Sequence, residues 1–126
     1  MAVREIAQDS WPAALDSFSR QHEGSIVSIT TRDPRGAVAV AAHDVPLQGV
    51  SSASPLSNDI AIIVGGGRSH LTHEVHDPAS LELDLTTNEA ERALIIHGND
   101  GSATTIAFRS PVRPEEADGV PVRDRR

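Results

Sequence analysis

The apolar positions near the start of the chain follow a helical period. Apolar side chains recur at the spacing of one helix face, at Trp11, Ala14, Leu15 and Phe18. Ser10 and Pro12 suit a helix start, because serine can cap a free amide and proline loses no hydrogen bond in the first turn. Gly24 suits the left-handed residue that ends many helices. We therefore predict a helix over residues 11–22 whose apolar face packs on the core.

After residue 24 the apolar positions follow a period of two, which is typical of half-buried strands. This pattern predicts strands over residues 25–31, 36–42, 60–64, 71–75, 81–85, 93–97 and 103–109. The clearest alternation places Leu81, Leu83 and Leu85 on one face. Residues 45–50 are apolar too, but Pro46 and Gly49 interrupt them, which favours an edge or a bend.

These elements predict a mainly β (α+β) domain. One N-terminal helix should pack on a curved antiparallel sheet or small barrel of six to seven strands. Short connections favour hairpins over crossovers, since tight turns join only antiparallel strands. We assign residues 1–112 to this single domain. Residues 113–126 carry prolines and alternating charges without an apolar period, which predicts a disordered C-terminal tail.

Cysteine and lysine are both absent from the sequence, and this removes several kinds of chemistry. Without cysteine there are no disulfides, thiol nucleophiles or cysteine-ligated metal sites. Without lysine there is no Schiff base and no phosphate-loop lysine. The 11 basic residues are arginines, which pair with anions but do not shuttle protons. We expect no cofactor.

The 126-residue chain is acidic, with a formal net charge of −7. A nucleic-acid surface needs cations and aromatic stacking platforms, and this chain has three aromatic side chains in all. No apolar run approaches the roughly 20 residues of a membrane helix, and the first residues lack the apolar centre of a signal peptide. We expect a cytoplasmic protein with neither a membrane nor a nucleic acid as partner.

The segment with the most suggestive chemistry holds three histidines and two carboxylates: His70, His73, Glu74, His76 and Asp77. Such side chains can bind zinc. On a strand, however, His73 points away from His70 and His76, and those two lie about 20 Å apart. A neighbouring strand would have to add ligands, such as His97 or Asp84. We predict no metal site here, but a half-buried, hydrogen-bonded His73 beside two solvated histidines.

Other candidate motifs fail on spacing. The glycines at 65–67 follow an apolar strand, but no helix follows to hold a phosphate. No G-x-S-x-G elbow positions a nucleophilic serine. Glu82 and Asp84 share one strand face about 7 Å apart, and we interpret them as the charged outer side of an amphipathic strand. We therefore predict no catalytic residue.

Several segments together carry a likeness to known proteins: residues 4–6, 11–12, 18–24 (FSRQHEG), 45–50 (VPLQGV), 60–65, 70–73, 100–101 and 108–110. In this order they resemble a family of small bacterial proteins of unknown function, over about residues 3–112. The resemblance implies one domain in which a helix precedes antiparallel strands. It brings no assigned activity, cofactor or catalytic residue. It draws attention to residues 18–24 and 45–50.

We predict a binding or interaction module rather than an enzyme, with a protein or a small molecule as its unknown partner and a homodimer as a further candidate. The candidate interaction residues are Arg20, His22, Glu23, Leu47, Gln48 and His73. Arg20 and His22 also suit a helix C-terminus, where cations meet free carbonyl groups. One alternative is a histidine-based metal-binding protein or minimal enzyme centred on residues 70–76. Another is a small-barrel nucleic-acid binder, which the charge disfavours.

Overall fold

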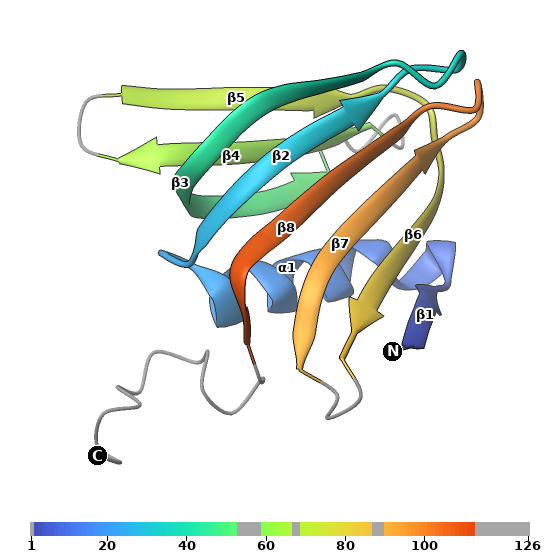
Figure 1. Ribbon diagram of the computed structural model, residues 1–126. Coiled ribbons are helices and arrows are strands. Elements are labelled where there is room, and N and C mark those ends of the chain that lie inside the picture. Colours follow the sequence, from blue (N-terminus) through green and yellow to red (C-terminus); the bar gives the residue numbers. More distant parts are fainter. Residues whose placement is uncertain (1, 53–58, 67–68, 87–89, 113–126) are drawn as a thin grey trace.

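The computed structural model describes residues 2–52, 59–66, 69–86 and 90–112 (Figure 1). The elements follow one another as β1 (Ala2–Ile6), a 3-10 turn η1 (Gln8–Ser10), α1 (Trp11–His22), β2 (Ile26–Arg32), β3 (Val38–Ser52), β4 (Ile60–Gly66), β5 (Ser69–Val75), β6 (Pro78–Leu85), β7 (Glu91–Gly98) and β8 (Ala103–Val112). The predicted order of one helix followed by antiparallel strands is confirmed. The tail predicted over residues 113–126 lies outside the described residues.

All eight strands belong to one antiparallel sheet, in the order β1-β6-β7-β8-β2-β3-β4-β5. The sheet is open, with β1 and β5 at its two borders. Of the two predicted forms, the protein therefore adopts the curved sheet and not the small barrel. Figure 1 shows the sheet curving and α1 lying along one of its faces. The additional strand is β1, whose residues pair with β6 from Ala2 opposite Leu85 to Ile6 opposite Leu81.

The helix spans residues 11–22, as its apolar spacing predicts, and ends near Gly24. Its start differs from the prediction, because the Ser10 side chain makes no capping hydrogen bond. The turn η1 runs directly into α1, and the Ser10 amide donates to the carbonyl oxygen of Ala7 at 2.9 Å. A cap is therefore not needed there. Gly24 has a φ of 88° and donates its amide to Leu47 at 2.8 Å, which ties the helix end to β3.

One hydrophobic core fills the space between α1 and the sheet. From the helix it takes Trp11, Leu15 and Phe18, and from the strands mainly aliphatic side chains such as Ile29, Leu47, Ile62, Leu81, Leu94 and Ile106. The inward orientation predicted for Leu81, Leu83 and Leu85 is confirmed. Ala14, which belongs to the predicted helix stripe, is half-buried and borders a pocket instead.

The two segments predicted around residues 36–42 and 45–50 form a single long strand, β3. The strand bends rather than ends, because its register against β2 shifts near Ala42 and Asp44 takes a φ of 49°. A bulge of this kind inserts an unpaired residue and turns the strand without breaking it. Its first part, residues 38–46, pairs with β2, and its last part pairs with β4.

Candidate functional site

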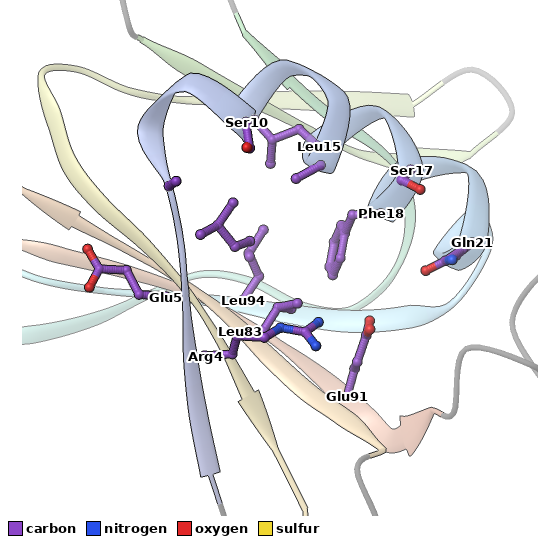
Figure 2. Close-up of a pocket in the computed structure, with 13 residues that line it drawn as sticks. Arg4, Glu5, Ser10, Leu15, Ser17, Phe18, Gln21, Leu83, Glu91 and Leu94 are labelled. Atoms are coloured by element: carbon purple, nitrogen blue, oxygen red, sulfur yellow. The ribbon is translucent and has the colours of Figure 1, made fainter.

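A pocket of about 470 Å³ lies between α1 and the end of the sheet formed by β1, β6 and β7 (Figure 2). We call it the α1–β7 pocket. Its lining consists of Arg4, Glu5, Ile6, Ala7, Ser10, Ala14, Leu15, Ser17, Phe18, Gln21, Leu83, Glu91 and Leu94. Four of these are buried core side chains: Leu15, Phe18, Leu83 and Leu94. An apolar base with a few polar groups is typical of small-molecule sites.

The most unusual polar group of the pocket is the carboxylate of Glu91, whose side chain is almost fully buried. Its oxygen Oε1 lies 2.5 Å from Nε2 of His22, which is completely buried at the last turn of α1. Buried carboxylates are costly unless they are hydrogen-bonded. The contact to His22 therefore fixes both the end of the helix and the start of β7.

Glu91 reaches the interior through an irregularity in β7. A regular strand places residues three apart on opposite faces, yet Glu91 and Leu94 both line the pocket. Against β6, the adjacent residues Asp84 and Leu85 pair with Ala93 and Glu91, which leaves Arg92 as the extra residue of a bulge in β7. The bulge turns Glu91 to the core side of the sheet. Arg92 remains partly exposed and pairs with Asp84 at 2.6 Å.

The ring of His22 is held between two phenylalanines. Its centroid lies 4.6 Å from that of Phe18 and 4.5 Å from that of Phe108. Its other nitrogen, Nδ1, is buried and has no hydrogen-bond partner among the described residues. A buried N–H without an acceptor is costly, so the hydrogen bonding assigns the proton to Nε2, which donates to Glu91.

Two opposite charges face the pocket without pairing with each other. The Oε2 oxygen of Glu91 accepts no hydrogen bond from the described residues, and Arg4 makes no ion pair with them. Figure 2 shows the Arg4 side chain extending from β1 toward the side of the pocket where Glu91 stands. Gln21 and Ser17 lie on the helix side. The pocket therefore offers a hydrogen-bond acceptor and a guanidinium donor above an apolar base.

The structure places the two segments 18–24 and 45–50 side by side. Beyond the Gly24–Leu47 bond, the hydroxyl of Ser19 donates to the carbonyl oxygen of Val50, and it accepts from the Val50 amide, both at 2.8 Å. Ser19 also lies beside Gly49, where an added Cβ would stand 3.6 Å from the Ser19 hydroxyl, an ordinary contact. Several residues of these two segments thus hold α1 against β3 by hydrogen bonds.

The six predicted interaction residues do not form one surface. Arg20 and Glu23 are exposed near the helix end, and Arg20 pairs with Asp16 at 2.9 Å. Gln48 is half-buried and donates its side-chain amide to the carbonyl oxygen of Gly65. Leu47 and His22 are fully buried, so neither presents a surface to a partner. Glu91 is the residue that sequence reasoning missed, because the pattern began this strand at residue 93, whereas β7 begins at Glu91.

The three histidines at positions 70, 73 and 76, the last of them just after β5, lie as the strand geometry predicts, with one difference. His73 is half-buried, but it makes no side-chain hydrogen bond among the described residues, in contrast to the prediction. His70 is exposed. His76 is exposed as well, and its Nδ1 lies 2.9 Å from Asp59 Oδ2. Across the described ranges, no three histidine or carboxylate side chains gather as a metal site would require.

Two of these polar groups have shifted pKa values. The hydrogen bond from the Asp77 amide, followed by that with His76, lowers the pKa of Asp59. The same hydrogen bond to Asp59 raises the pKa of His76. His76 is exposed directly after β5, whereas Asp59 is half-buried directly before β4. Glu82 and Asp84 on β6 are paired as well, with His97 at 2.9 Å and with Arg92.

An open antiparallel sheet around one N-terminal helix, with a pocket at the helix, defines a small mainly β domain. The chain belongs to a family of unknown function, DUF5335, whose family model matches residues 2–117. This confirms the resemblance inferred from the sequence. None of the described helices is long and apolar enough to cross a membrane.

Among solved structures, the chain is similar to the Bacillus subtilis YojF protein. The two share 12% sequence identity, the match covers 88% of this chain and 97% of that one, and the TM-score is 0.51. At this identity the likeness concerns the fold alone. A search of curated proteins gave no match.

Proposed function

We propose that this protein is a non-enzymatic binding module whose α1–β7 pocket holds a small organic molecule. The observation that carries the proposal is the Glu91 carboxylate, which is 6% exposed and lines the pocket with one oxygen still available. A strand bulge brings this carboxylate into the interior, where only one of its two oxygens is hydrogen-bonded within the protein. A ligand that donates a hydrogen bond to the second oxygen would lower the free-energy cost of burying the group.

The size and lining of the pocket support a small ligand rather than a protein segment. Small-molecule sites measure about 300–1,000 Å³ and combine an apolar lining with a few placed polar groups. The value of about 470 Å³ lies within this range. Leu83 and Leu94 from the sheet and Phe18 from the helix supply the apolar part.

The two unpaired charges define the polar ends of the ligand. Glu91 calls for an N–H donor, such as an ammonium or amide group. Arg4 calls for a carboxylate or a carbonyl oxygen, which a guanidinium binds well. The ligand class that meets all three requirements is an apolar amino acid or a small amide of similar shape.

L-phenylalanine is a suitable first probe, because each of its polar groups can be removed in turn. Phenethylamine lacks the carboxylate, and hydrocinnamic acid lacks the amine. Titrations followed by amide chemical shifts should show the largest changes at Leu15, Phe18 and Leu94, and tightest binding for phenylalanine. Glu91→Gln should abolish the preference for phenylalanine over hydrocinnamic acid. Arg4→Gln should abolish its preference over phenethylamine.

The chain offers matched controls for this experiment. Glu82→Gln removes another carboxylate that pairs with a histidine, His97, outside the pocket, and should leave binding unchanged. Ala14→Leu fills the pocket without touching either charge and should abolish binding. Absence of binding by all three probes at millimolar concentration would refute this ligand class. Chemical conversion of a bound probe would contradict the non-enzymatic part of the proposal.

A further inference from the structure

The border of the sheet at β5 has the features of a self-pairing strand. β5 (Ser69–Val75) pairs with β4 without a single register shift over seven residues. It ends the strand order, and Figure 1 shows it along the border of the sheet. Among the described residues no strand pairs with its other side, which therefore presents free backbone N–H and C=O groups. A long, regular border strand of this kind is a template for pairing with another chain.

The sequence of β5 carries few of the devices that normally prevent such pairing. Natural border strands are short, bulged or interrupted by proline, or carry charges that repel a partner. β5 has none of the first three, and its apolar Leu71 is 46% exposed. The border of β5 is therefore open to a partner strand.

We propose that the partner is a second copy of this chain, which pairs antiparallel with β5 about a two-fold axis at Thr72. Full overlap of residues 69–75 with their copies places Thr72 opposite Thr72. It also places each His70 opposite Glu74 of the other copy, and each Leu71 opposite His73. Threonine pairs stabilise neighbouring strands, and the His70 ring can donate a hydrogen bond to the Glu74 carboxylate of the other copy. The strand is thus self-complementary in the way that a two-fold interface requires.

The side chains involved are free to make these contacts. His70, Thr72 and Glu74 are exposed on the same face of β5. His70 makes no hydrogen bond or ion pair among the described residues. Glu74 lies 3.8 Å from His76, a loose contact that leaves its carboxylate half exposed. The two His70–Glu74 pairs would therefore form without breaking a strong interaction.

The other open strand borders are less suitable. Full self-overlap of β1 places Arg4 opposite Arg4, and like charges directly opposite are destabilising. The first part of β3 also lacks a second neighbour and exposes Val38 and Val40. Its register shift near Ala41 limits the regular run to residues 38–40, however, and a bulge bends a strand away from pairing. β5 is the longest regular border that the described ranges offer.

The test uses the absence of cysteine from the chain, so that an introduced cysteine is unique. Opposite residues of antiparallel strands have Cα atoms about 4.5–5.5 Å apart, which suits a disulfide. Thr72→Cys should therefore form a covalent dimer under mild oxidation. His70→Cys in the same strand should not, because the two copies of residue 70 would lie four residues apart along the pair, roughly 14 Å. Val40→Cys tests the β3 border.

Sedimentation equilibrium of the full chain gives an independent measurement. The wild type should approach twice the 13.4 kDa chain mass as concentration rises. Thr72→Arg places two like charges on the axis and should return the protein to 13.4 kDa, with melting unchanged at concentrations where the wild type is itself monomeric. Val40→Arg should remain dimeric. A monomeric wild type at millimolar concentration, equal cross-linking at residues 70 and 72, or cross-linking at residue 40 instead would each overturn the proposal.

Discussion

His22 and Glu91 meet at 2.5 Å in the interior although 69 residues separate them in the chain. The contact joins the last turn of α1 to the first residue of β7, and both side chains are buried. A single hydrogen bond thus links the helix to the part of the sheet that lines the pocket. This hydrogen bond therefore depends on the tertiary structure and not on local sequence.

We expect this pair to show strong coupling in a double-mutant cycle. His22→Phe leaves the Glu91 carboxylate without its donor and should lower the free energy of unfolding by about 1–3 kcal/mol. Glu91→Leu leaves the His22 N–H unsatisfied and should have a similar cost. The double variant should lose less than the sum of the two, because it leaves no polar group unsatisfied. Urea unfolding of the four proteins measures the difference, and simple additivity would contradict the assigned hydrogen bond.

The local pattern of the chain was sufficient for most of the fold. The helix over residues 11–22 follows from four apolar positions at helical spacing and from Pro12 in its first turn. The inward side of β6 follows from its alternating leucines. In both cases the burial of one face produces a periodic pattern of apolar residues within a short stretch of sequence. Such a pattern can be recognised without knowledge of the rest of the chain.

The candidate site could not be found in this way. Glu91 directly follows a polar stretch, and an alternating β7 would place it on the side opposite Leu94. Its actual position depends on the bulge at Arg92 and on the contact with His22 at the end of the helix. Arg4 faces the same pocket because β1 pairs with β6. Register shifts and pairing between distant segments leave no periodic signal in the sequence.

Phe18 should be the most sensitive position of the helix. Its side chain is 5% exposed, contacts the rings of His22 and Phe108, and forms part of the pocket wall. Phe18→Ala should lower the free energy of unfolding by about 3–5 kcal/mol, because it removes a buried aromatic ring and leaves a cavity. Chemical denaturation checks this value. Ala13→Gly, at an exposed helix position, is the control and should cost no more than about 1 kcal/mol.

Gly65 and Gly24 should respond differently to substitution by alanine. Both have positive φ values, 104° and 88°, so a side chain is strained at either position. At Gly24 an added methyl group would meet open space, whereas at Gly65 it would collide with the backbone carbonyl oxygen of Ser69. We expect Gly65→Ala to lower the melting temperature clearly more than Gly24→Ala. Equal effects would mean that the strained φ alone, not the approach of β5 to β4, decides the cost.

The Asp59–His76 pair should make stability depend on pH in a defined direction. The raised pKa of His76 means that its contribution is present below the ordinary value of 6.5 and is lost as the pH rises through the folded-state pKa. The lowered pKa of Asp59 means that its contribution is present above the ordinary value of 3.8 and is lost as the pH falls through the folded-state pKa. The pair should therefore stabilise the fold most between these two values.

Thermal melting between pH 3 and pH 9 tests this expectation with His76→Gln as the variant. The difference in melting temperature between wild type and variant should be largest near pH 5 and should shrink above neutral pH, where His76 loses its proton. His70→Gln is the matched control, because His70 is an exposed histidine on the adjoining strand β5 and has no carboxylate partner in its own chain among the described residues. Its melting difference from the wild type should not follow that pH profile at protein concentrations low enough to keep the chain monomeric. A His76→Gln difference that stayed constant across the whole range would contradict this role of the pair, and Asp59 would then act through other contacts, such as its hydrogen bond from the Asp77 amide.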